Sequence, residues 1–305
     1  MRVFVTGASG HIGSALVPEL LGNGHEVVGL ARSDRSAAAL QAAGAEVWRG
    51  DLDDLDGLRA AAKAADGVIH LAFKHEVMLS GDFLRAVADD LAAIEAMGAA
   101  LEGSGKPFVA TGGTLMLANA EIQERPNLEQ DVLPGGPRVD AENTVAGFAE
   151  RGIRSSWVRL APLVHSSLDH HGFAHLLIGI ARDKGVSGYV GDGATRWPAL
   201  HTLDAARLYR RAVESAPAGS RLHGVGDEGV PFKDIAEVIG RRLNLPVKSI
   251  DPQDAGAHFG FLGNFVALDD WTSNARTREI LGWAPAHAGL IDDLTHGHYF
   301  DNVTA

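Results

Sequence analysis

TGASGHIG, residues 6–13 of this 305-residue chain, lies between an apolar run at 3–5 and a segment whose apolar residues recur at helical spacing up to Leu20. This order predicts a strand, a tight turn and an amphipathic helix. Glycine at 7 permits the turn, glycine at 10 lets a ligand approach the backbone, and glycine at 13 lets the helix pack on the strand. Because the first turn of a helix has unpaired N–H groups, the loop is predicted to cradle phosphate groups.

Strand-like and helical segments go on alternating after this loop, which predicts a parallel sheet with helices on both faces. From about His165 the alternation gives way to loops, and a smaller lobe is expected to start there. The predicted fold class is therefore α/β, a doubly wound parallel sheet of the Rossmann type with a smaller C-terminal substrate lobe. We assign 1–165 to the dinucleotide-binding domain, with 196–225 returning to it, and 166–195 and 226–305 to the lobe. The predicted strands are 3–5, 25–30, 45–48, 66–72, 106–110 and 153–160, and the predicted helices start near His11 and cover 37–43, 83–101 and 142–151.

Composition narrows the classes of function. The formal net charge is −12, from 27 Lys and Arg against 39 Asp and Glu, so a surface that neutralises nucleic-acid phosphates is not expected. There is no cysteine, which excludes disulfides, thiolate catalysis and cysteine-ligated zinc and favours the reducing cytoplasm. Strand-like residues begin at Arg2, so we expect no secretory signal, and no apolar run reaches the roughly 20 residues of a membrane helix.

The chain resembles the short-chain dehydrogenase/reductase superfamily, in its extended and atypical branches related to NAD(P)-dependent epimerases and dehydratases. The resemblance implies a Rossmann domain that binds a nicotinamide dinucleotide and a small C-terminal substrate domain. The segments that carry it are TGASGHIG at 6–13, GDL at 50–52, HLA at 70–72, AE at 141–142, WPALHTLDAARL at 197–208 and REILGWAP at 278–285.

The end of the second predicted strand indicates which dinucleotide binds. An NAD enzyme usually places an acid there to hold the ribose hydroxyls, but this chain has Ala31 followed by Arg32. Arg32, with Ser33 and Arg35, suits the 2′-phosphate of NADP(H), while Asp34 leaves NAD(H) as the alternative. The predicted cofactor-binding residues are Gly7, Ser9, Gly10, His11, Ile12, Gly13, Arg32, Ser33, Arg35, Asp51, Leu52, Leu71, Ala72, Phe73, Arg138 and Pro162.

The catalytic pattern of the family is missing. The family carries a Ser or Thr after the fifth strand and a Tyr-x-x-x-Lys on the next helix, in which the tyrosine exchanges the substrate proton. Aligned on the AE segment, Arg138 takes the lysine position and Pro134 the tyrosine position, and Gly112 replaces the hydroxyl. Arginine stays protonated and cannot shuttle a proton. The three tyrosines lie elsewhere, at 189, 209 and 299.

Other side chains are therefore candidates for the proton donor. His165, which follows the strand at 153–160, is the leading one because imidazole titrates near neutrality. Lys74 and His75 follow the fourth strand, and Thr111 and Thr114 flank Gly112. The predicted catalytic residues are His165, Thr114, Thr111 and Lys74, and the predicted substrate-binding residues are Lys74, Met116, His165, Trp197, His201 and Phe261.

Three functions follow in order of preference. The first is an NADP(H)-dependent oxidoreductase that reduces a small or medium apolar carbonyl or conjugated compound, the second a catalytically silent NADP(H)-binding redox sensor, and the third an NAD-retaining epimerase or dehydratase. The histidines at 170, 171 and 175 lack a metal-ligand spacing, so no metal site is expected. Neither nucleic acid nor membrane is an expected partner. Members of the family often dimerise through the helices that correspond to 80–103 and 138–151. The first of these helices carries an apolar stripe, Phe83, Val87 and Leu91, which would suit either a homodimer interface or packing on the sheet.

Overall fold

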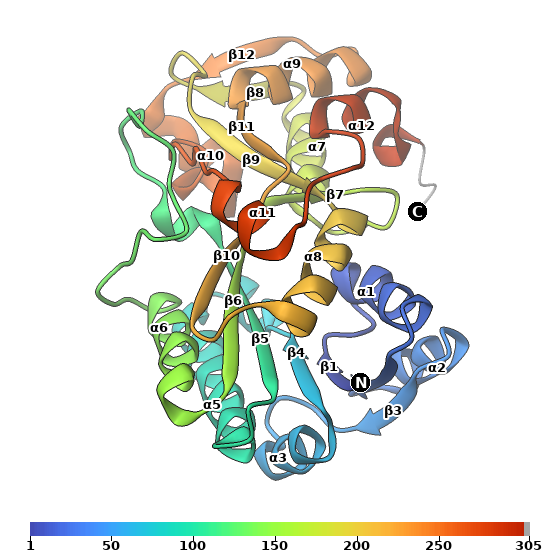
Figure 1. Ribbon diagram of the computed structural model, residues 1–305. Helices are drawn as coiled ribbons and strands as arrows, with labels where there is room; N and C mark the ends of the chain where they lie inside the picture. The colour runs from blue at the N-terminus through green and yellow to red at the C-terminus, as the bar shows by residue number, and fades with distance from the viewer. Residues whose placement is uncertain (302–305) are drawn as a thin grey trace.

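The computed structural model describes residues 1–301, in which a parallel sheet of seven strands has helices on both faces (Figure 1). The strand order is β10-β6-β5-β4-β1-β2-β3, with every neighbouring pair parallel, so the predicted doubly wound fold is confirmed. The strands are β1 (Arg2–Thr6), β2 (Glu26–Ala31), β3 (Glu46–Arg49), β4 (Gly67–His70), β5 (Pro107–Gly113), β6 (Arg154–Leu160) and β10 (Ser220–Gly224).

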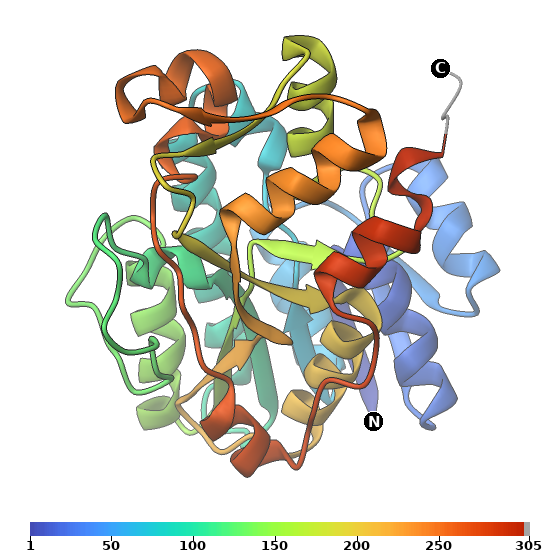
Figure 2. The same ribbon diagram turned by 90° about the horizontal axis from the view of Figure 1, so that it is seen from above.

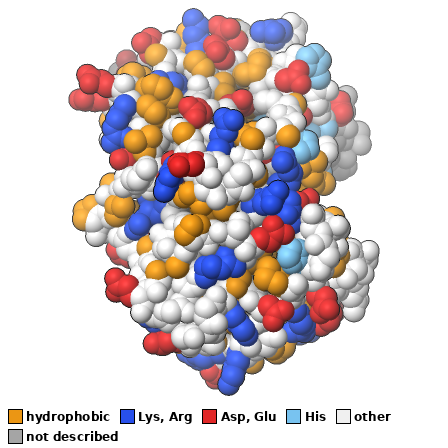
Figure 3. Space-filling model, in the orientation of Figure 1, with side chains coloured by type: hydrophobic (Ala, Val, Ile, Leu, Met, Phe, Trp, Pro, Cys, Tyr) orange, Lys and Arg blue, Asp and Glu red, His pale blue; other side chains and the backbone are white. Residues whose placement is uncertain are grey.

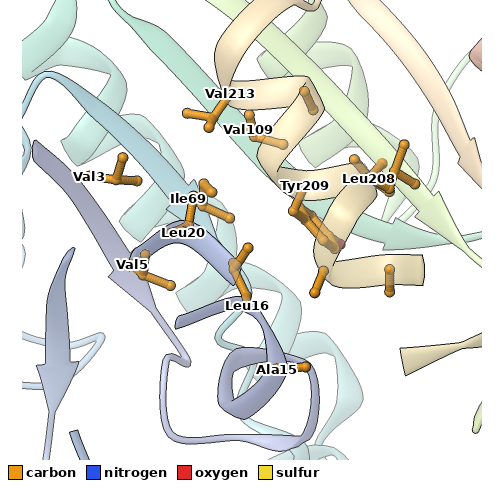
Figure 4. Close-up of a cluster of buried hydrophobic side chains, with 14 of the residues drawn as sticks. Val3, Val5, Ala15, Leu16, Leu20, Ile69, Val109, Leu208, Tyr209 and Val213 are labelled. Atoms are coloured by element: carbon orange, nitrogen blue, oxygen red, sulfur yellow. The ribbon is translucent and has the colours of Figure 1, made fainter. Parts of the chain in front are cut away.

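Two apolar cores lie on the two faces of this sheet. On one face, α1 (His11–Gly22) and α8 (Thr202–Ser215) pack on side chains such as Val5 and Ile69 (Figure 4). On the other face, α3 (Leu55–Ala64), α5 (Phe83–Leu101) and α6 (Val139–Gly147) bury side chains against Phe4 and Phe108. A strand buried on both faces reads as a continuous apolar run, which is why Val3 to Val5 shows no alternation.

The chain leaves the carboxyl ends of β5 and β6 to build a second lobe, which occupies the upper half of Figure 1. Its core is a separate apolar cluster that includes Trp197 and Phe232, and Figure 2 shows the lobe from above. Within the described residues it has a three-stranded sheet in the order β11-β9-β7 and a two-stranded sheet, β12-β8. Its elements are β7 (Leu163–His165), α7 (Phe173–Lys184), β8 (Ser187–Val190), β9 (Arg196–His201), β11 (Asp227–Pro231), α9 (Phe232–Leu243), β12 (Val247–Ile250), α10 (Ala255–Phe259) and α12 (Leu290–His296), with the 3₁₀ turns η3 (Pro252–Asp254), η4 (Gly260–Asn264) and η5 (His298–Phe300).

Element boundaries differ from the sequence predictions where local hydrogen bonds decide them. The helix expected at 37–43 is α2 (Asp34–Ala42), which begins earlier because the Ser33 side chain accepts a hydrogen bond from the backbone N–H of Ser36. The helix expected at 142–151 divides into α6 and a 3₁₀ turn, η2 (Phe148–Arg151), that ends at the left-handed Gly152. The remaining elements are α4 (His75–Leu79), η1 (Thr114–Leu117) and α11 (Ala275–Leu281).

The surface carries both signs of charge. On the face drawn in Figure 3, basic and acidic side chains are intermingled. No helix among residues 1–301 is long and apolar enough to span a membrane.

Replacing Gly13 by Ala tests how tightly the glycine loop packs. The new Cβ would lie 2.2 Å from the carbonyl oxygen of Gly7, a backbone atom that cannot swing aside. We expect Gly13→Ala to lower the free energy of unfolding by about 2 kcal/mol or more, as overpacking does. The control is Gly22→Ala at the far end of the same helix, where a Cβ meets nothing in the described chain within 4 Å. For Gly22→Ala, the free energy of unfolding should rise by about 0.5–1 kcal/mol. Chemical denaturation measures both variants, and equal stabilities would contradict the prediction.

Candidate active site

The glycine loop lies in the crevice at the carboxyl end of β1. Gly7 has a φ of +68°, and a Cβ on it would meet the backbone nitrogen of Ala72 at 2.8 Å, so only glycine lets the loop approach the end of β4. A Cβ on Gly10 would meet only the Gly7 oxygen, at 3.2 Å, within the described chain. Ser9 and Gly10 are exposed, and α1 starts at His11 with its amide dipoles directed at the crevice. The loop therefore has the open backbone surface that a dinucleotide pyrophosphate requires.

Polar side chains surround the crevice at the ends of β2 and β3. Arg32 is exposed and forms an ion pair with Glu76 of α4. Ser33 caps α2, and its carbonyl oxygen accepts a hydrogen bond of 2.7 Å from Nη1 of Arg49 at the end of β3. Two further residues predicted to bind cofactor lie after β3: the Asp51 carboxylate accepts hydrogen bonds from the following loop, and Leu52 is buried. Arg35 is exposed on α2.

Arg138 lies at the centre of a buried network at the ends of β4 and β5. Its guanidinium forms an ion pair with Asp90 of α5 and donates a hydrogen bond of 2.6 Å to the carbonyl oxygen of Thr111. It stacks over Phe73 at 4.6 Å and over Trp157 at 5.5 Å from the ring centroids. Guanidinium groups stack well on aromatic faces, so Arg138 is held on four sides.

The same network reaches the start of the glycine loop. The second oxygen of Asp90 lies 3.1 Å from Nε2 of His70, whose Nδ1 is 2.7 Å from the hydroxyl of Thr6. The Thr6 hydroxyl accepts a hydrogen bond from the backbone N–H of Ala72. These side chains are buried and all their polar groups are paired, so the network gives the crevice a rigid floor.

Trp157 explains the absence of a hydroxyl at position 112. A Cβ on Gly112 would lie 2.5–2.7 Å from three atoms of the Trp157 indole ring, which fills the space of the missing side chain. Thr111 beside it hydrogen-bonds at 2.8 Å to the carbonyl oxygen of His70 and to the hydroxyl of Tyr209 on α8. Burial raises the pKa of Tyr209, so this phenol stays protonated.

Thr114 lies in a second buried cluster. Its hydroxyl donates a hydrogen bond of 2.6 Å to Asp270, which lies between η4 and α11 and also accepts one from Thr272. Burial raises the pKa of Asp270 to about 6, although the hydrogen bond from Thr114 opposes the shift. Thr114 and Thr111 therefore have different neighbours, and the structure does not bring them together.

His165 lies at the end of β7 and is buried. Its Nδ1 is 2.8 Å from a carboxylate oxygen of Asp293 on α12, and its Nε2 has no hydrogen-bond partner among residues 1–301. The ring packs edge-on against His201 at 5.5 Å. Burial, with the neighbouring His165 and His287, lowers the pKa of His201. His165 thus has one nitrogen oriented by a carboxylate, while the other is buried without a hydrogen-bond partner in the described chain.

The glycine loop is linked to His165 through a hydrogen-bonded threonine. Nε2 of His11 is 2.7 Å from the hydroxyl of Thr202, which donates a hydrogen bond to the carbonyl oxygen of His165. Burial lowers the pKa of His11, although Asp169 opposes the shift. Predicted residues from distant parts of the sequence, His11 and His165, therefore meet through one threonine.

The other predicted residues lie further apart. Lys74 bonds the carboxylates of Asp53 and Asp89, which raise its pKa although burial opposes them. Trp197 is buried in the core of the lobe, where Phe173 lies between it and Phe261. Ile12, Leu71, Met116 and Pro162 are half-buried at the ends of elements. Among the described residues no group of His, Asp and Glu side chains is arranged to hold a metal ion.

Several polar residues of the site were not predicted from sequence. Asp90, His70 and Asp293 each pair with a residue that is remote in sequence, and nothing in their local pattern separates them from solvated charges. The HLA segment contains His70, so a buried partner for that imidazole was the one local signal available.

The fold and the glycine crevice are those of the Rossmann class of dinucleotide-binding folds, and comparison with known proteins gives the family. A model of the NAD dependent epimerase/dehydratase family matches residues 3–124. An uncharacterized protein of Schizosaccharomyces pombe is 45% identical over 98% of this chain and 100% of its own length. The 3-diazoavenalumate denitrifying reductase of a Streptomyces species is 29% identical, covering 96% of this chain and 99% of that protein.

Solved structures share the fold of this chain. The dTDP-glucose 4,6-dehydratase DesIV of Streptomyces venezuelae, solved with NAD, has a TM-score of 0.76 at 18% identity, covering 97% of this chain and 95% of that one. The chain belongs to the NAD-dependent epimerase/dehydratase family, as the sequence motifs predicted.

A serine at position 112 should not restore the family's hydroxyl. Because the Trp157 ring occupies that space, we expect Gly112→Ser to cost about 1–3 kcal/mol in the free energy of unfolding. Gly113→Ser is the matched control, since its Cβ would lie 3.7 Å from its nearest neighbour, the Leu160 oxygen. Chemical denaturation measures both variants, and a Gly112→Ser protein as stable as Gly113→Ser would contradict the packing argument.

Asp270 should give the protein a characteristic dependence of stability on pH. Its folded pKa of about 6 exceeds the roughly 3.9 of an unfolded aspartate, so its contribution is fully present below pH 4 and is lost as pH rises through 6. We expect the stability of Asp270→Asn relative to wild type to increase by about 2–3 kcal/mol between pH 4 and pH 7.

The neighbouring aspartate is the control. Burial opposes ionisation of Asp269, but hydrogen bonds from Arg196 outweigh it and lower the pKa, so its contribution is present above its unfolded pKa and lost as pH falls. The relative stability of Asp269→Asn should therefore change in the opposite direction. Parallel pH profiles for the two variants would show that Asp270 is ionised throughout.

Proposed function

We propose that this protein is an NADP(H)-dependent oxidoreductase that reduces a small or medium apolar carbonyl or conjugated compound. The observation that carries the cofactor assignment is Arg32, which extends its guanidinium beside the crevice where an NAD enzyme places an acid. Ser33 and Arg35 lie beside it, and Arg49 brings a further cation to the Ser33 carbonyl. The one acid in this segment, Asp34, is paired with Arg49.

The residues of the crevice fit a nicotinamide dinucleotide. The backbone of Gly10 to Gly13 would hold the pyrophosphate, and Asp51 with Leu52 would border the adenine. Phe73 and Arg138 would lie beside the nicotinamide half, where the family holds its ribose. The bound cofactor supplies a hydride to the electrophilic carbon of the substrate.

The chain must supply the proton that balances this hydride. We assign that role to His165, whose Nε2 would donate a proton to the carbonyl oxygen while Asp293 stabilises the imidazolium through Nδ1. Arg138 stays charged and would act on orientation alone. The apolar core of the lobe and the exposed ring of Phe261 favour a substrate without many charges.

A second function is favoured by one observation. The Trp157 indole fills the position of the family's hydroxyl, and the Arg138 guanidinium already binds Asp90 and the carbonyl oxygen of Thr111. A protein that binds NADP(H) without turnover and signals redox state to a partner would have no use for that hydroxyl. An epimerase or dehydratase that retains NAD ranks third, since it too normally needs the missing tyrosine.

The proposal is tested with purified protein, NADPH or NADH, and a panel of ketones, aldehydes and enones. We expect NADPH binding by nicotinamide fluorescence and oxidation of NADPH by one class of substrate. His165→Gln should keep NADPH binding and lose about 100-fold or more in turnover, as removal of a general acid does.

A matched control uses His25→Gln. The His25 side chain is 9% exposed and also pairs with a carboxylate, Glu214, but it precedes β2 at the opposite end of the sheet. Unchanged turnover in His165→Gln would remove that residue from the mechanism. NADPH binding with no turnover of any substrate would favour the sensor, and binding of neither nucleotide would refute the cofactor assignment.

A further inference from the structure

Two ion pairs cross the cofactor crevice. Arg32 follows β2 and Glu76 follows β4, and β1 lies between these strands in the sheet, so the Arg32–Glu76 pair crosses the end of β1 beside the glycine loop. Lys74 reaches further, to Asp53 after β3, at 2.5 Å. The segment 73–79 is thus fastened across the adenosine side of the crevice.

The Glu76 carboxylate binds the Arg32 guanidinium as two phosphate oxygens would. Both carboxylate oxygens face the guanidinium, Oε2 at 3.2 Å from Nη1 and Oε1 within hydrogen-bond distance of Nη2. Such a fork is the geometry in which arginine binds phosphate oxygens. The hydrogen bond from Arg32 lowers the pKa of Glu76, so the carboxylate is ionised at neutral pH.

The two anchors of this segment differ in strength. Lys74 is mostly buried and holds two carboxylates, those of Asp53 and Asp89, whereas the Glu76 side chain is 75% exposed. In the described chain, α4 has five residues and none of them is buried. Gly81, two residues after the end of this helix, has a φ of +99°. Breaking the Arg32–Glu76 pair would therefore free α4 without opening an apolar core.

We propose that Glu76 is an internal competitor for the 2′-phosphate of NADP(H), and that binding of this phosphate to Arg32 displaces Glu76 and releases α4. This inference rests on the proposed NADP(H) specificity. NAD(H), which has a hydroxyl at that position, leaves the pair intact. Glu76 thus sets how strongly the protein prefers the phosphorylated cofactor, because every NADP(H) that binds must first break an ion pair.

The test compares the dissociation constants of NADPH and NADH for wild type, Glu76→Gln and Arg32→Gln, followed by nicotinamide fluorescence. Exposed ion pairs are weak, so removing the competitor should tighten NADPH binding about two- to five-fold and leave NADH binding unchanged. Arg32→Gln should weaken the binding of NADPH and leave the binding of NADH unchanged. Glu279→Gln, which removes an equally exposed carboxylate from an arginine pair on α11, controls for net charge and should change neither constant.

The outcomes separate the two proposals. If Arg32→Gln leaves NADPH affinity unchanged, the NADP(H) assignment of the proposed function fails. If Arg32→Gln weakens NADPH but Glu76→Gln does not tighten it, the assignment stands and the competitor is refuted.

Hydrogen exchange gives a second readout. NADPH, but not NADH, should speed amide exchange across residues 75–81, and Glu76→Gln should show that faster exchange before any nucleotide is added. Equal exchange with both nucleotides would overturn the release of α4.

Discussion

The close approach of backbone to backbone around the glycine loop is the constraint on which the rest of this structure depends. Gly7 meets the start of the segment after β4 and Gly13 meets the carbonyl of Gly7, with no room for a side chain at either contact. These contacts set α1 against the sheet and leave its first amides facing the crevice. The buried chain from Thr6 through His70 to Asp90 continues the same floor towards Arg138. A single rigid surface thereby joins the cofactor loop to the position of the family's lysine.

A second buried network fastens the last strand of the sheet. Arg159 of β6 pairs with Glu142 of α6 and lies 3.1 Å from Nε2 of His223 on β10. Burial, assisted by the charge of Arg159, lowers the pKa of His223 to about 3, so the ring stays neutral and accepts the hydrogen bond from the guanidinium. Its Nδ1 donates to the carbonyl of Ser273 in the segment that leads to α11. Charged groups buried in this way are costly to separate, because either partner alone would be left unsatisfied.

The sequence predicted the features that local pattern controls. The alternation of strands and helices predicted a parallel, doubly wound sheet, and the glycine spacing identified the crevice and the family. Contacts between residues that are remote in sequence could not be predicted. Nothing near Arg32 signals Glu76, which is 44 positions away, and nothing near Thr114 signals Asp270, which is 156 positions away. Such pairs depend on how loops lie over the sheet, and a single sequence carries no record of that. The assigned roles of Arg32 and His165 therefore stay predictions, while the places of these residues in the fold are known.

The pairing of Gly112 with Trp157 bears on how this chain relates by descent to family members that keep the hydroxyl. A large ring on β6 and a missing side chain on β5 share one volume, so changing either residue alone costs stability. Restoring a hydroxyl at position 112 without loss of stability therefore needs two changes at once, because a serine alone meets the ring and a smaller residue at 157 alone leaves a void. The two positions are coupled, so a substitution at one of them changes which residues the other can accept.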